Sequence, residues 1–139
     1  NDIMISQKKI GGILIESRTG EKGLGLVVGI GLNINESEDD IPGELQDTAT
    51  SLHIDSGEEF GREIILSSIL NEFEKLYFHH WNDIILLWQK YCIHENEEVT
   101  FHSNDKFHKG TFHGITESGH AQIQINGKTE TFPNGMITL

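Results

Sequence analysis

The sequence has little cysteine and little positive charge, and each scarcity excludes a class of protein. With Cys92 as its one cysteine, the chain cannot form an internal disulfide, which is typical of a reducing compartment. Cys92 follows an apolar, helix-like run, so we expect a buried structural thiol rather than a nucleophile. The chain carries ten basic residues against 22 acidic ones. This balance argues against general binding of nucleic acid or of an anionic membrane surface, because both require cations opposite phosphates.

Long hydrophobic runs are also absent. No apolar stretch approaches the length of a membrane span, and no basic segment followed by an apolar one opens the chain. The sequence therefore predicts a cytoplasmic protein without a membrane partner. Asn1 stands where a natural chain would begin with Met, and a strand-like stretch follows at once. We therefore expect the chain to begin inside a larger protein.

The 139 residues, of which 36% are hydrophobic, can form one core or a small domain plus part of another. The pattern changes near residues 92–96, which predicts segments 1–93 and 94–139. The first segment predicts strands at Asp2 to Ile5, Lys9 to Glu16 and Leu24 to Asn35, with a hairpin loop at Ser17 to Gly23. Near-continuous Leu, Val and Ile in the third strand predict burial on both faces.

Two helices are predicted next, over about 58–79 and 82–91. Ser56 is a plausible N-cap for the first, and apolar residues recur along both at helical spacing. Between strand and helix lies a polar loop with a run of acids, which we interpret as a solvated surface.

After His94 the sequence predicts short strands at 97–102, 107–115, 121–125 and 128–132. Turn signals separate them, and Asn126-Gly127 is a strong two-residue hairpin signal. Several short strands at close spacing predict a small closed barrel, so the fold class is α+β. The eight histidines form no HxH or HExxH signature and no CxxC accompanies them, so no metal site is assigned.

Two pairs of glycines interrupt the second and third strands, Gly11 with Gly12 and Gly29 with Gly31. Glycine weakens a strand, and its presence marks a bulge, packing relief or close approach of a ligand to the backbone. The pattern alone leaves these alternatives open. The stretch "GIGLN" is not GxGxxG and no helix follows it closely, so a dinucleotide-binding loop is not predicted.

Polar residues gather at one end of these glycine-bearing strands. Lys9 would place a cation at the rim of a flat pocket, with Asp2 and Asn33 nearby. Such a site suits a ligand with an apolar body and an anionic head, because a lysine stabilises charge that builds on a carboxyl or phosphoryl group. The alternative interpretation is that Lys9 is an ordinary surface lysine at a strand end.

Four stretches in this order resemble biotin protein ligases: "NDI", "KKIGGILIE", "VVGIGLNIN" and "IPGELQDTATSL". Each stretch is weak alone, whereas their order and spacing together are specific. The tail "GTFHGITESGHAQIQINGKTETFPNGMITL" is similar to the family's terminal module, although Ala121 stands where the family usually has Leu.

The resemblance implies a mixed β-sheet backed by helices, followed by a small SH3-like barrel. Residues 1–93 would be the C-terminal part of the catalytic domain and residues 94–139 the barrel. It further implies an ATP-dependent ligase that forms biotinyl-5′-AMP in the presence of Mg²⁺. The enzyme would then transfer biotin to a lysine of a biotin carboxyl carrier domain in a biotin-dependent carboxylase.

The resemblance also implies roles for individual residues. Lys9 matches the catalytic lysine that contacts the biotin carboxyl and the α-phosphate. No residue is assigned as a metal ligand. The residues that match biotin-lining positions are Lys9, Gly12, Ile13, Leu14, Gly29 and Ile30, and those that match the nucleotide side are Asn1, Asp2 and Asn33.

Other family motifs, including the glycine- and arginine-rich loop that folds over the adenylate, would lie N-terminal to Asn1. We therefore expect this chain alone to be inactive. Two alternatives remain: a relative of lipoate–protein ligase, and a non-catalytic fragment that binds a protein partner. An open sheet edge would also allow a homodimer.

Overall fold

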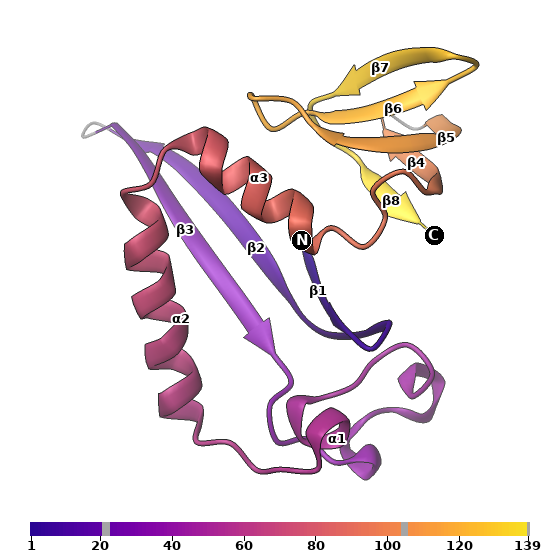
Figure 1. Ribbon diagram of the computed structural model, residues 1–139. Coiled ribbons are helices and arrows are strands. Elements are labelled where there is room, and N and C mark those ends of the chain that lie inside the picture. Colours follow the sequence, from indigo (N-terminus) through magenta and orange to yellow (C-terminus); the bar gives the residue numbers. More distant parts are fainter. Residues whose placement is uncertain (21–22, 104–105, 139) are drawn as a thin grey trace. The chain divides into compact units, whose positions relative to one another are not determined.

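The computed structural model describes residues 1–20, 23–103 and 106–138 (Figure 1). The chain divides into two compact units, Asn1–Asn71 and Glu72–Leu139. Helix α2 (Arg62–Tyr77) crosses from the first unit into the second. The boundary near residues 92–96 stays a prediction.

The first unit contains a three-stranded antiparallel sheet in the order β1-β2-β3. Its strands are β1 (Asp2–Ile5), β2 (Lys8–Gly20) and β3 (Gly23–Leu32), which confirms the three predicted strands. The predicted hairpin loop is wrong over Ser17–Gly20, which continues β2 and pairs with β3 as far as Gly20 opposite Gly23. Residues 21 and 22 of that loop lie outside the described residues.

Strand β3 ends at Leu32, before the predicted Asn35, and the side chain of Asn35 bonds outside the sheet. The Asn35 side chain donates to the Phe60 carbonyl at 2.8 Å and accepts from the Phe60 amide at 2.9 Å. These two hydrogen bonds imitate a strand pairing with a side chain instead of a backbone, so the chain leaves the sheet here.

The predicted burial of the third strand on both faces is wrong. Every residue from Gly23 to Gly31 is exposed, and Leu24 and Leu26 expose 68% and 62% of their surface. An apolar sequence permits a strand to be buried on both faces, but burial also requires layers that pack on those faces. The described residues of this unit form no such layers over β3.

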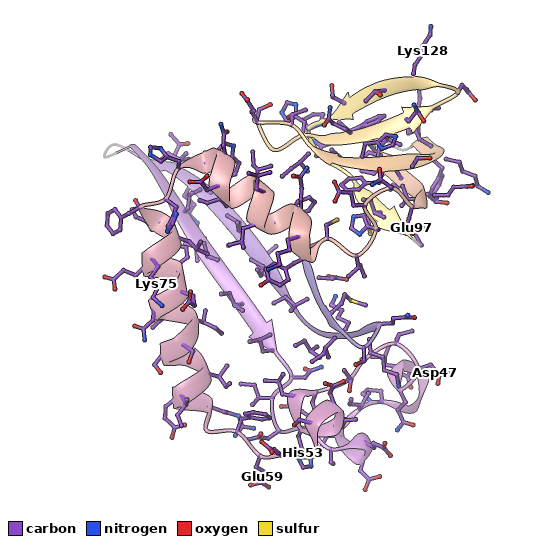
Figure 2. The ribbon with its side chains drawn as sticks, viewed as in Figure 1. Asp47, His53, Glu59, Lys75, Glu97 and Lys128 are labelled. Carbon is purple, nitrogen blue, oxygen red and sulfur yellow. The ribbon has the colours of Figure 1, made fainter. Side chains whose placement is uncertain are left out.

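Two short 3₁₀ turns and a short helix follow β3. They are η1 (Glu38–Asp40), η2 (Gly43–Leu45) and α1 (Leu52–Ser56), which lies beside the turn between β1 and β2 in Figure 1. Figure 2 labels Asp47, after η2, and His53, on α1. The prediction of Ser56 as an N-cap is wrong, because Ser51 caps α1 and Ser56 is its last residue. Gly57, with φ +75°, ends α1, and α2 begins only at Arg62.

The second unit contains α3 (Trp81–Tyr91), which confirms the second predicted helix, and a five-stranded antiparallel sheet in the order β7-β6-β5-β4-β8. The strands are β4 (Glu98–Ser103), β5 (Lys106–Ile115), β6 (Ala121–Ile125), β7 (Lys128–Phe132) and β8 (Met136–Thr138). The first four match the predicted strands to within one residue, whereas β8 was not predicted. Asn126 and Gly127 both have positive φ (50° and 78°), as the predicted hairpin requires. Lys128 projects from that turn (Figure 2).

The core of this unit lies inside the curled sheet. It consists of Val99, Phe101, Phe112 and Ile123, none more than 2% exposed. The rings of Phe101 on β4 and Phe132 on β7 lie 4.8 Å apart, although these strands are not neighbours in the sheet. The sheet therefore bends over its core as in a small barrel, and the α+β class is confirmed.

Helix α3 packs against this sheet. The rings of Trp88 and Phe112 lie 6.3 Å apart, and the Trp81 indole donates to the Glu117 carbonyl. Cys92 is half-buried against the core cluster, and burial raises the pKa of its thiol. The described chain contains no helix with the length and apolarity of a membrane span.

Candidate functional site

A shallow depression of about 450 Å³ lies across the starts of β1 and β2 and the end of β3 in the first unit. It brings together eight of the nine residues that the sequence predicted for ligand binding, with Asn33 as the exception. Gly31 also contributes, a residue that the glycine pattern had marked but that was not assigned to a ligand. The lining residues are Asn1, Asp2, Lys9, Gly12, Ile13, Leu14, Gly29, Ile30 and Gly31.

The register of β2 with β3 explains the flat floor of this depression. Gly12 pairs with Gly31, and Leu14 pairs with Gly29. Directly paired residues of an antiparallel ladder share a face, as do residues two apart on one strand. Three glycines therefore occupy one face side by side, and Leu14 is the one side chain among them.

Gly11 has a structural reason to be glycine. A Cβ there would lie 2.2 Å from the carbonyl oxygen of Gly31 on the neighbouring strand. Packing relief, one of the alternatives left open by the sequence, therefore applies to Gly11.

The other three glycines have no such reason. A Cβ on Gly12 would approach no atom closer than 3.5 Å, one on Gly29 none closer than 3.7 Å, and one on Gly31 would meet nothing within 4 Å. None of the three has a positive φ. Since neither packing nor backbone conformation calls for glycine here, close approach of a ligand explains the bare floor best.

A charged pair marks the rim. The Lys9 ammonium lies 2.8 Å from Asp2 Oδ1, and both side chains are about half exposed (47% and 50%). Exposed ion pairs of this kind contribute only about 0–1 kcal/mol. The Lys9 ammonium can therefore exchange Asp2 for an anionic ligand group at little cost.

The backbone of Lys9 is held more firmly than its side chain. Its amide donates to the Thr48 carbonyl at 2.8 Å, and its carbonyl accepts from the Thr50 amide at 2.9 Å. These bonds form an isolated parallel bridge between Lys9 and Ala49, which supplies the parallel component of the predicted mixed sheet. The sequence identified "ATSL" only as part of a family motif. Its pairing with Lys9 was not predicted, because no local pattern links two segments so far apart.

Asn33 lies outside the depression. Its amide donates to the Ile10 carbonyl at 2.7 Å, and its side chain donates to the Thr50 carbonyl at 3.0 Å. Asn33 thus holds the same segment that holds Lys9. Its contact with a nucleotide stays a prediction.

A larger depression of about 520 Å³ lies at the start of α2, and none of the predicted residues line it. Arg62 and Glu63 line it together with the Asn35 amide, which is already paired on both sides with the Phe60 backbone. We therefore place the candidate site at Lys9. Within residues 1–20, 23–103 and 106–138, no three His, Cys, Asp or Glu side chains are grouped to hold a metal.

No protein-family model matches the chain. Two similar curated proteins are both named bifunctional ligase/repressor BirA. The one from Bacillus spizizenii is 43% identical over 98 residues, which cover 67% of this chain and 30% of that protein. The one from Bacillus subtilis is 34% identical over 131 residues, which cover 91% of this chain and 40% of that protein. The chain thus spans less than half the length of these relatives.

Solved structures of biotin protein ligase from Aquifex aeolicus are similar over nearly the whole chain. The apo structure matches with a TM-score of 0.82 and 25% identity, covering 99% of this chain and 62% of that one. The complex with biotin and ATP matches with a TM-score of 0.79 and 27% identity, covering 99% of this chain and 58% of that one.

Proposed function

Because this chain belongs to the biotin protein ligase family and corresponds to its C-terminal part, we propose that it forms one side of a biotin-activating site. The full-length protein would join biotin and ATP into biotinyl-5′-AMP and release pyrophosphate. It would then transfer biotin to a lysine of a biotin carboxyl carrier domain.

The bare glycine floor with Lys9 at its rim carries this proposal. Biotin has a compact fused ring system and a carboxylate at the end of an apolar chain. The floor of Gly12, Gly29 and Gly31 accepts a ring against the backbone, and Lys9 offers a cation to the carboxylate. A relative with the same fold has been solved with biotin and ATP bound.

Lys9 would act in the first step. A biotin carboxylate oxygen attacks the α-phosphorus of ATP, a P–O bond forms, and the bond to the leaving pyrophosphate breaks. Negative charge spreads over the phosphoryl oxygens in the transition state, and a fixed ammonium stabilises it. For this role Lys9 exchanges Asp2 for the substrate.

In the second step the amine of the carrier lysine attacks the biotinyl carbonyl carbon. An amide bond forms, AMP leaves with the electron pair of the broken C–O bond, and the amine loses a proton. Because the biotin acceptor is a lysine amine, the partner protein must present an accessible lysine. Because the reaction consumes ATP and Cys92 is unpaired, we place it in the cytoplasm.

Asn1 and Asp2 line the depression beside Lys9, and both would face the nucleotide. The Asp2 carboxylate suits Mg²⁺, which binds proteins through one or two carboxylates and otherwise through substrate phosphates and water. When bound, Mg²⁺ would neutralise phosphate charge. Breaking the Lys9–Asp2 ion pair would then make Lys9 available to the substrate and Asp2 available to Mg²⁺.

The outer strands β1 and β3 each pair on one side only among the described residues. Free edges accept further strands, and we include a homodimer as a subsidiary proposal. Sedimentation of the full-length protein at several concentrations tests it, and a single monomeric species throughout would reject it.

The test of the main proposal is biotin-dependent pyrophosphate release by the full-length protein. Lys9→Ala should reduce the rate by about 100-fold or more, the usual loss when one transition-state charge donor is removed. Lys128→Ala, at an exposed hairpin turn (Figure 2), is the matched control and should keep the rate. Normal release by Lys9→Ala would reject the role of Lys9. Equal release with lipoate in place of biotin would favour the lipoate-ligase alternative.

A further inference from the structure

Two lysines stand side by side at the start of β2, and only one of them lines the candidate site. Successive strand residues point to opposite faces, so Lys8 and Lys9 diverge. Lys9 is exposed at the depression, whereas Lys8 is half-buried. The Lys8 ammonium donates to the Gln46 carbonyl at 2.6 Å, across 38 residues of sequence.

Gln46 makes several hydrogen bonds within and beyond the loop that follows β3. Its side-chain amide donates to the Glu38 carbonyl at 3.1 Å and to the Ile41 carbonyl at 3.2 Å. Its backbone carbonyl accepts a hydrogen bond from the Lys8 ammonium. The side chain of Gln46 is therefore bonded to the acidic loop, and its backbone is bonded to the start of β2.

The same short segment holds the backbone of Lys9. Thr48 and Thr50, just beyond Gln46, accept from and donate to Lys9 at 2.8 and 2.9 Å. Residues 46–50 are thus bound to residues 8–9 at three points. If the Lys8 bond were lost, two backbone bonds would still join Thr48 and Thr50 to Lys9.

The turn before Lys8 adds a fourth attachment. Ser6 donates its hydroxyl to Asp55 Oδ1 at 2.7 Å, on α1. Ser6 and Gln7 have φ of 47° and 65°, a backbone conformation that residues other than glycine rarely adopt. The chain accepts this strain immediately before the two lysines, where its path determines which face Lys9 occupies.

We propose that Lys8 is a positioning residue for Lys9: its bond to the Gln46 carbonyl fixes the segment that sets the Lys9 backbone, and so places the Lys9 ammonium over the bare floor. This inference rests on the proposed function. It adds a second lysine whose effect on the ligand passes entirely through the first.

An ammonium suits this role because a charge-assisted hydrogen bond to a carbonyl is stronger than a neutral one. Methionine at position 8 would keep most of the apolar stem and lose the donor. Arginine would keep a charged donor. Lys8→Met and Lys8→Arg therefore separate the hydrogen bond from the packing of the stem.

The experiment measures the affinity of the full-length protein for a non-hydrolysable biotinyl-adenylate analogue. Lys9→Ala should weaken binding by about 100-fold and Lys8→Met by about tenfold, because small displacements of a placed group lose this much. In the Lys9→Ala background, Lys8→Met should weaken binding less than about twofold, since a positioning effect disappears with the group it positions. Lys8→Arg should stay within about threefold of the wild type. Thermal unfolding of each variant confirms that it is folded.

Each result has a separate meaning. If Lys8→Met weakens binding equally with and without Lys9, Lys8 acts on its own or on the fold, and the inference is overturned. It is also overturned if Lys8→Met binds as tightly as the wild type, or if Lys8→Arg is as weak as Lys8→Met. If instead Lys9→Ala has no effect, the proposed role of Lys9 fails, and the positioning inference fails with it.

Discussion

The Lys9 ammonium lies 2.8 Å from an Asp2 carboxylate oxygen, at the rim of a floor formed by three glycines. In the proposed site both partners of this pair have another use, Lys9 for the biotin carboxylate and α-phosphate and Asp2 for the nucleotide side. In that site the ion pair would keep the two groups together until substrates separate them.

The first prediction concerns Asp2. Asp2→Asn removes the negative charge beside Lys9 and leaves a side chain of nearly the same shape. Affinity for MgATP should fall by about tenfold, because the ligand offered to Mg²⁺ loses its negative charge. Affinity for biotin should not fall, because Lys9 no longer has a competing anion. Calorimetric titration of the full-length protein with each ligand measures both, and an equal loss for the two ligands would contradict the assignment.

The second prediction contrasts two glycines on neighbouring strands. A Cβ on Gly11 would lie 2.2 Å from the Gly31 carbonyl oxygen, whereas one on Gly31 would meet nothing within 4 Å. Gly11→Ala should therefore destabilise the fold by about 1–3 kcal/mol. Gly31→Ala should change the free energy of unfolding by no more than about 0.5–1 kcal/mol.

For Gly31, we expect a large effect on ligand binding where the effect on stability is small. Its alanine variant should fold normally and still bind the biotinyl-adenylate analogue at least about tenfold more weakly, because the methyl group occupies the floor. Urea denaturation and titration of the same samples measure the two quantities. A Gly31→Ala protein that binds normally would remove the floor from the account.

The third prediction concerns acid stability. His94 is half-buried with its ring 4.7 Å from that of Phe112, and burial lowers its pKa from 6.5. The folded state thus binds fewer protons than the unfolded state near this pH. Stability should be full above about pH 6.5 and should decrease as the pH falls through the lowered folded pKa.

His94→Phe keeps an aromatic contact with Phe112 and removes the titration. Denaturation of the wild type and the variant at pH 7.5 and pH 5 gives the difference in their pH dependence. The wild type should lose more stability than the variant between these values. Equal losses would show that His94 does not titrate as its burial requires.

The fourth prediction concerns the turn between β1 and β2. Gln7 has φ +65°, where glycine is preferred, so Gln7→Gly should stabilise the chain by about 0.5–1 kcal/mol. Gly127, with φ +78° in the β6–β7 turn, is the converse case, and Gly127→Ala should destabilise by about 1 kcal/mol. Thermal unfolding of both variants checks the pair. If Gln7→Gly lowers stability, the turn is not strained in the proposed sense.

Local patterns in the sequence were sufficient for much of this structure. The glycines, Lys9 and Asp2 lie in adjoining strands, so strand prediction brings them to one end of the sheet. The Asn126-Gly127 turn and the strands beside it likewise depend on neighbouring residues.

Contacts between distant segments could not be predicted in this way. The bonds from Thr48 and Thr50 to Lys9, and from Lys8 to Gln46, join stretches whose sequences carry no mutual signal. Strand β8 is three residues long, too short for a periodic pattern. The exposure of β3 was missed because apolar composition shows what a strand can bury, while neighbouring layers decide what it does bury.

The most direct test of the central claim is calorimetric titration of the full-length protein with a non-hydrolysable biotinyl-adenylate analogue, with Lys9→Ala and Lys128→Ala in parallel. We expect the wild type and Lys128→Ala to bind alike and Lys9→Ala to bind about 100-fold more weakly. Equal affinity in all three would show that the Lys9 strand and its glycine floor are not the ligand site.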